Sequence, residues 1–171
     1  MFRKLLFSLL GIALLFAYTQ FYYDQVMNQR DQVMLEYITW ITENSDYVYN
    51  DEELPKILFK TQRRMAELFY GEDFREDIPG NISGLYNTIE NEIILPYGTK
   101  FSDYNNQPTL VHELVHFLQN THGKFGNVCV GELEIEAYEL QIQWMDEVGH
   151  TQERPDEFSY RVLILACYPY L

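Results

Sequence analysis

Two histidines and a glutamate in the middle of the chain have the spacing of a metal site. His112, Glu113 and His116 form a His-Glu-x-x-His sequence. Residues four apart lie on the same face of an α-helix, so both imidazoles can bind one Zn²⁺ ion. Glu113 lies at the edge of that face and can hold a water molecule on the ion. The spacing therefore predicts a zinc site with Glu113 as general base, and the alternative is a helix with two unrelated histidines.

The helix that carries this sequence has recognisable ends. We expect it over residues 106–121, with an asparagine as its cap, Pro108 in its first turn and Gly123 beyond its end. A second long helix is expected over residues 131–148, and an apolar segment follows at residues 160–168. The two long helices are the elements that must bring metal ligands together.

Ahead of these helices the pattern changes to short runs and turns. Residues 82–86 and 92–95 are alternating or apolar runs around a polar turn, which predicts a β-hairpin closed by Pro96. Helices are expected at residues 24–43, from their apolar spacing, and at residues 51–71, from an aspartate cap and a glycine stop. Together the elements predict an α+β fold, with helices packed on a short hairpin or sheet.

Several further features accompany the histidine pair over about residues 55–170. They are a short hairpin with Leu85 and Tyr86, a His-Glu-x-Val-His-x-x-Gln helix from His112 to Gln119, Cys129 five residues before Glu134, and an Ala-Tyr-x-x-Gln run that starts at Ala137. This combination resembles the gluzincin side of the zincin-like superfamily, and more closely a family of small exported bacterial zincin-like proteins. The resemblance implies a minimal zincin-like metallopeptidase fold, without implying a particular substrate.

The resemblance also implies a third zinc ligand on the downstream helix. Gluzincins take that ligand from a helix packed against the first, in several families as Glu-x-x-Ala followed by a polar residue. Glu134, Ala137 and Tyr138 match this pattern, and Ala137 is small enough for close helix packing. Glu136 is the alternative, but it lies about 200° around the helix from Glu134, so both cannot bind one ion. We favour Glu134.

His122 is a third candidate for this ligand. Its spacing from the histidine pair is that of the metzincins, which have a glycine where this chain has Gln119. That glycine lets the chain bend sharply enough to bring the last histidine back to the metal. A helix that continues through Gln119 carries His122 away, so we expect His122 to lie at the helix C-terminus.

The N-terminus has the layout of a leader. Arg3 and Lys4 precede an apolar run over residues 5–17, as in a charged region followed by the hydrophobic part of a signal sequence. Residues 1–23 are therefore expected to be either a cleaved signal peptide or an uncleaved membrane anchor. In both cases residues 24–171 lie outside the cytoplasm, in the periplasm or held at the membrane.

The composition sets limits on size and partners. The chain has 171 residues, of which 47% are hydrophobic, enough for one domain with its own core over residues 24–171. The formal net charge of −14 repels polyanions, so nucleic acid is excluded as a partner. Cys129 and Cys167 can pair in an oxidising compartment, and the alternative is two separate buried thiols.

These patterns lead to an expected function and a rival. The expected function is an exported zinc metallopeptidase that hydrolyses peptide bonds in a peptide or protein substrate, with Tyr138 and His150 as candidate donors to the developing oxyanion. The strand that ends near Leu95 is expected to be an edge that pairs with the extended substrate. The rival is a non-catalytic periplasmic binding or assembly module that keeps the fold.

Overall fold

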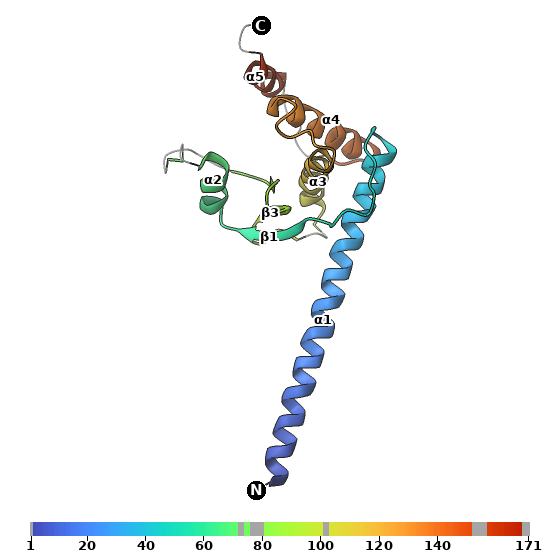
Figure 1. Ribbon diagram of the computed structural model, residues 1–171, viewed down its shortest axis with the longest axis vertical. Helices are drawn as coiled ribbons and strands as arrows, with labels where there is room; N and C mark the ends of the chain where they lie inside the picture. Colours follow the sequence, from blue (N-terminus) through green and yellow to red (C-terminus); the bar gives the residue numbers. More distant parts are fainter. Residues whose placement is uncertain (1, 72–73, 76–80, 101–102, 152–156, 169–171) are drawn as a thin grey trace. The chain divides into compact units, whose positions relative to one another are not determined.

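The computed structural model of the chain describes residues 2–71, 74–75, 81–100, 103–151 and 157–168. It divides into two compact units, residues 1–35 and residues 36–171. Helix α1 extends over Phe2–Glu43. It forms all of the first unit that is described, and its last residues belong to the second unit. Within the second unit, the described residues form helices and a small mixed sheet, which confirms the predicted α+β class (Figure 1).

Helix α1 contains the helix that was predicted over residues 24–43 and extends it to the N-terminus. The side chains of residues 2–14, 16, 17 and 23, which are most of those in the predicted leader over residues 1–23, lie outside the described part of the chain. Where side chains are described, no helix has the length and apolar character that a membrane crossing needs. The leader therefore stays a prediction.

Three short strands make up the sheet: β1 (Lys56–Lys60), β2 (Leu85–Asn87) and β3 (Glu92–Pro96). β2 and β3 pair in antiparallel orientation, which confirms the predicted hairpin. β1 pairs with β3 in parallel, so the strand order is β1-β3-β2. The prediction that β3 is an edge strand is therefore wrong. Its residues 92–94 pair with β1 on one side and with β2 on the other.

The prediction of a helix over residues 51–71 is also wrong for the first half of that range. Residues 56–60 form strand β1, because the backbone there pairs with β3, and this long-range pairing outweighs the local helical spacing. Helix α2 extends over Gln62–Tyr70. Its N-cap is Thr61, whose side chain accepts a hydrogen bond from the backbone N–H of Arg64. The predicted stop at Gly71 is correct, since Gly71 has a φ of +55°.

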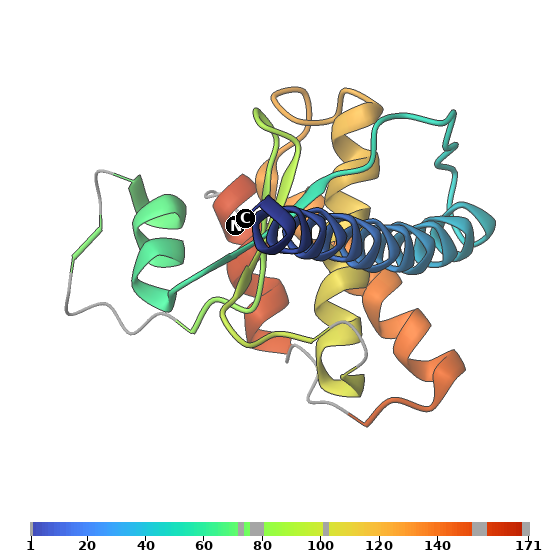
Figure 2. The same ribbon diagram turned by 90° about the horizontal axis from the view of Figure 1, so that it is seen from below.

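The C-terminal half consists of helices α3 (Gln107–Thr121), α4 (Val130–Val148) and α5 (Glu157–Cys167). α3 is buried almost along its whole length and packs against α4, which in turn packs against α5 (Figures 1 and 2). The two long helices agree with the predicted ranges to within one residue at each end. The apolar segment predicted at residues 160–168 falls largely within α5.

A disulfide joins the start of α4 to the end of α5. Cys129, the N-cap residue of α4, is bonded to Cys167, and their Cα atoms are 5.7 Å apart. The structure thus decides between the two alternatives that the sequence left open, because the cysteines pair. The helices approach closely here, since a Cβ on Gly131 would lie 2.1 Å from the carbonyl oxygen of Leu163. A disulfide across 38 residues stabilises a fold by about 2–4 kcal/mol, and this one holds the first turn of α4, the helix that carries Glu134.

Candidate metal centre

Three side chains from two helices converge on one point. His112 and His116, one turn apart on α3, bring their Nε2 atoms to 3.1 Å from each other. Glu134 on α4 places its Oε2 atom 3.3 Å from Nε2 of His112 and its Oε1 atom 3.3 Å from Nε2 of His116. Among the described residues, these three form the cluster of His, Cys, Asp and Glu side chains that could hold a metal ion.

The spacing of these atoms fits a tetrahedral zinc ion. Zinc binds imidazole nitrogen and carboxylate oxygen at about 2.0–2.1 Å, which puts neighbouring ligand atoms of a tetrahedron roughly 3.3 Å apart. The two Nε2 atoms are 3.1 Å apart, and each has one of the two Glu134 carboxylate oxygens at 3.3 Å, so either oxygen is within reach of an ion held by the imidazoles. Three protein ligands leave the fourth position open, as in catalytic zinc sites.

Hydrogen bonds to the other ring nitrogens orient both imidazoles. The Nδ1 atom of His112 lies 3.0 Å from Oε1 of Gln141, and the Nδ1 atom of His116 lies 2.7 Å from Oε1 of Gln119. An amide oxygen can only accept, so each Nδ1 carries a proton. A neutral ring with its proton on Nδ1 has a lone pair on Nε2, which is the form that binds a metal.

The electrostatics of the cluster favour positive charge at its centre. Burial alone would lower the pKa of His116, but the carboxylates of Glu134 and Glu113 raise it to about 9. Burial would raise the pKa of Glu134, but the two imidazoles lower it well below its ordinary value. In the metal-free chain a proton therefore supplies the positive charge, and a bound metal ion would displace it.

Glu113 is a buried carboxylate beside this cluster. Only 4% of its surface is exposed. Burial raises the pKa of Glu113, the two histidines lower it, and the Glu134 carboxylate adds to the rise, with a raised pKa as the net result. A carboxyl group with a raised pKa is suited to accept and return a proton near neutral pH.

Gly84, the residue before β2, makes room for this carboxylate. A Cβ built on Gly84 would lie 2.5 Å from Oε1 of Glu113 and 2.8 Å from Cγ2 of Thr109. Any side chain at this position would have to displace the carboxylate. This role of Gly84 is not predictable from the sequence, since only the packing of the hairpin on α3 brings it to Glu113.

The two candidate oxyanion donors lie in different surroundings. The Tyr138 ring on α4 packs against His112, with 4.5 Å between ring centroids. The His150 ring stacks on Tyr104 at 3.8 Å, and its Nε2 lies 2.7 Å from the Tyr104 carbonyl oxygen. Tyr104 begins the short helix η2 (Tyr104–Asn106), so His150 connects the end of α4 to that turn. Tyr138 is the one that contacts a residue of the cluster.

One family model matches residues 27–166, and it is described as a domain of unknown function, DUF6647. The chain belongs to this family. The matched region contains the whole cluster, Glu113 and Gly84. No curated protein and no solved structure matches the chain.

In this DUF6647 domain the other two candidates for the third ligand, Glu136 and His122, have hydrogen-bond partners outside the cluster. Glu136 accepts hydrogen bonds from Tyr47, Lys124 and Gln119. His122 follows the last residue of α3, where its Nδ1 lies 2.9 Å from the Leu118 carbonyl oxygen and its Nε2 accepts from a backbone N–H at 3.2 Å. Neither belongs to the cluster that Glu134 forms with the two histidines.

Sequence reasoning missed the contacts of the two glutamines. Both were visible as motif residues, but no partner had been assigned to either. A signal was present for Gln119, because residues three apart on a helix are neighbours and Gln119 follows His116 at that spacing. Gln141 lies on the other helix, so its contact with His112 depends on how α3 and α4 pack.

Proposed function

We propose that this chain is an extracytoplasmic zinc metallopeptidase with a minimal zincin-like fold. The convergence of His112, His116 and Glu134 beside a buried Glu113 carries the proposal. Two imidazoles and a carboxylate are a ligand set of catalytic zinc. A buried carboxylate beside the ligands supports catalysis over a purely structural zinc site, which has no use for a general base.

Each residue of the site has a role in peptide hydrolysis. A zinc ion held by the three ligands supplies the Lewis acid that polarises the scissile carbonyl. Glu113 accepts a proton from the attacking water and returns it to the leaving amine. Tyr138, which packs on His112, is the nearer candidate to donate a hydrogen bond to the carbonyl oxygen.

The substrate would bind along the β2 edge of the sheet. Among the described residues, β3 is the one strand that pairs with β2, and the chain enters β2 through Gly84, which lies against Glu113. An extended peptide that pairs with this edge passes over the general base. This proposal replaces β3 with β2 as the substrate-binding strand.

Export is supported by the disulfide. Bonds such as Cys129–Cys167 persist in oxidising compartments and are rare where thiols are kept reduced. Together with the expected leader over residues 1–23, the bond supports a location in the periplasm or at the outer face of the membrane.

Metal removal tests the proposal directly. We expect the full-length chain to hydrolyse a mixed peptide library, as read by mass spectrometry of the products. Stripping the chain with a zinc chelator should lower the rate at least about 100-fold, since the metal supplies several kcal/mol of barrier reduction. Zinc should restore the rate and magnesium should not, because magnesium prefers oxygen ligands. An intact chain that binds zinc but cleaves nothing would favour the binding or assembly module instead.

A second test uses Gly84→Ala. The added methyl group should push the Glu113 carboxylate out of place, because it would otherwise lie 2.5 Å from Oε1. We expect peptide hydrolysis to fall roughly 100-fold, the cost of misplacing a catalytic group by about 1 Å. Zinc content by metal analysis should stay at one ion per chain. The matched control is Ser83→Ala, at an exposed neighbouring position. Equal losses in both variants would contradict this role for Gly84.

A further inference from the structure

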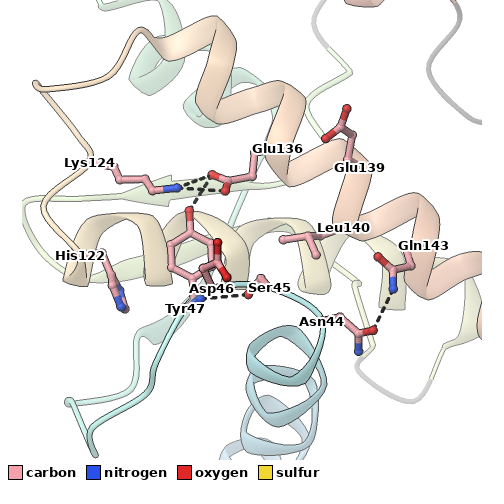
Figure 3. Close-up of a pocket in the computed structure, with 10 residues that line it drawn as sticks. All are labelled: Asn44, Ser45, Asp46, Tyr47, His122, Lys124, Glu136, Glu139, Leu140 and Gln143. Carbon is pink, nitrogen blue, oxygen red and sulfur yellow. Dashed lines mark hydrogen bonds and ion pairs between the residues drawn. The ribbon is translucent and has the colours of Figure 1, made fainter.

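A polar pocket of about 380 Å³ lies beside the end of α1 and along α4. Figure 3 shows Lys124 and Tyr47 both pointing toward Glu136. The Lys124 ammonium lies 2.9 and 3.0 Å from the two carboxylate oxygens, and the Tyr47 hydroxyl donates to one of them at 2.6 Å. The ammonium also lies 4.5 Å from the centre of the Tyr47 ring. The Glu136 carboxylate is therefore held in one position.

Glu136 is connected to the metal cluster through one amide. The Gln119 side chain is completely buried and lies between Glu136 and His116. Its Nε2 donates to Oε2 of Glu136 at 3.0 Å and to the carbonyl oxygen of Leu133 at 2.9 Å. Its Oε1 faces Nδ1 of His116 at 2.7 Å.

Those contacts fix which way the amide faces. A rotation of the Gln119 amide by 180° would point its oxygen at the Glu136 carboxylate and the Leu133 carbonyl, which are both acceptors. The rotated amide would also leave the buried donors and acceptors unpaired, at a cost of about 1–3 kcal/mol each. The oxygen therefore stays toward His116, and the proton of His116 stays on Nδ1.

The imidazole of His112 is oriented by weaker contacts. The amide that accepts from His112 belongs to Gln141, and its Nε2 has the thioether sulfur of Met145 as a partner at 3.9 Å. A thioether is a weak acceptor, so it holds the amide less firmly than a carboxylate does. The two histidine ligands therefore differ in how strongly the surrounding protein fixes their tautomer.

We propose that Glu136, held by Lys124 and Tyr47, is a positioning residue that acts through the Gln119 amide to keep Nε2 of His116 free for the metal. The inference deepens the proposed function, because it assigns a role to a carboxylate that does not itself bind zinc. It also explains why an acidic residue two positions from Glu134 points away from the cluster and into a network of donors.

Zinc affinity tests the positioning role. Competition with a chelator on the full-length chain should show roughly tenfold weaker zinc binding for Glu136→Gln, within the 10–100-fold range of changes to groups that orient metal ligands. Glu139→Gln is the matched control, because Glu139 lines the same pocket on the same helix. Its zinc affinity should stay within about twofold of wild type. Gln119→Met removes the amide that joins Glu136 to His116, so zinc affinity should fall by close to 100-fold.

The tautomer of His116 is a readout that a merely structural role would not change. The chain has four histidines, so long-range ¹H–¹⁵N NMR can resolve each ring. In metal-free protein at a pH where the imidazoles are neutral, wild type and Glu139→Gln should show the His116 proton on Nδ1, opposite the Gln119 oxygen. Glu136→Gln should show a mixture.

Unchanged zinc affinity and an unchanged tautomer in Glu136→Gln would overturn the inference, and a changed tautomer would support it. If wild type binds no zinc, the proposed function fails, and the tautomer alone decides whether Glu136 positions His116. Glu136→Gln also guards against a failure of Gln119→Met to fold, since Glu136 is only half-buried.

Discussion

Replacement of Glu134 by alanine should lower zinc affinity by several orders of magnitude. Glu134 is the proposed ligand from α4, and each of its carboxylate oxygens lies 3.3 Å from the Nε2 atom of one of the two histidines. Without it, two imidazoles remain, which make a poor tetrahedral site. Chelator competition on the full-length chain measures the loss, and far-UV circular dichroism checks that the variant remains folded.

Two further alanine variants make the comparison specific. Glu136→Ala and His122→Ala should lower zinc affinity by no more than roughly 10–100-fold, because neither side chain reaches the cluster. His122→Ala is the milder of the two, since among the described residues the hydrogen bonds of His122 go to Leu118, Thr121 and Val48 and include neither Gln119 nor a residue of the cluster. If His122→Ala lost the metal and Glu134→Ala kept it, the assignment of the third ligand would be wrong.

The resemblance to gluzincins implies Glu134 as the third ligand, and helical geometry, which is local and therefore readable in the sequence, shows which side chains can share one face. His112 and His116 share a face of α3 because they are four apart. Glu134 and Glu136 face different ways because they are two apart on α4. The structure agrees, with Glu134 at the histidines and Glu136 at Lys124.

Features that depend on contacts distant in sequence were not predictable in this way. The apolar residues 57–59 suit either a helix or a strand, and the pairing of residues 56–60 with β3, more than 30 residues later, decides for the strand. The same pairing places β3 inside the sheet. The contact of Gly84 with Glu113 likewise requires the hairpin to pack on α3.

Replacement of Glu113 by glutamine should abolish peptide hydrolysis and leave zinc in place. The amide has nearly the size of the carboxylate and fits against Gly84, so packing around α3 should change little. It cannot accept a proton from water, and loss of a general base costs about 10²–10⁴-fold in rate. Metal analysis should still give one zinc per chain, because the three ligands are intact.

Glu113→Asp is the matched control for this substitution. Aspartate keeps a carboxylate but draws it back by one methylene, so the rate should lie between those of wild type and Glu113→Gln, with zinc retained. This order would show that the proton-accepting group matters, since packing is disturbed more by Asp than by Gln. Equal hydrolysis by wild type and Glu113→Gln would place the catalytic base elsewhere. Equal inactivity of all three zinc-loaded proteins across broad peptide libraries would instead favour a module that binds a partner and keeps the metal for its structure.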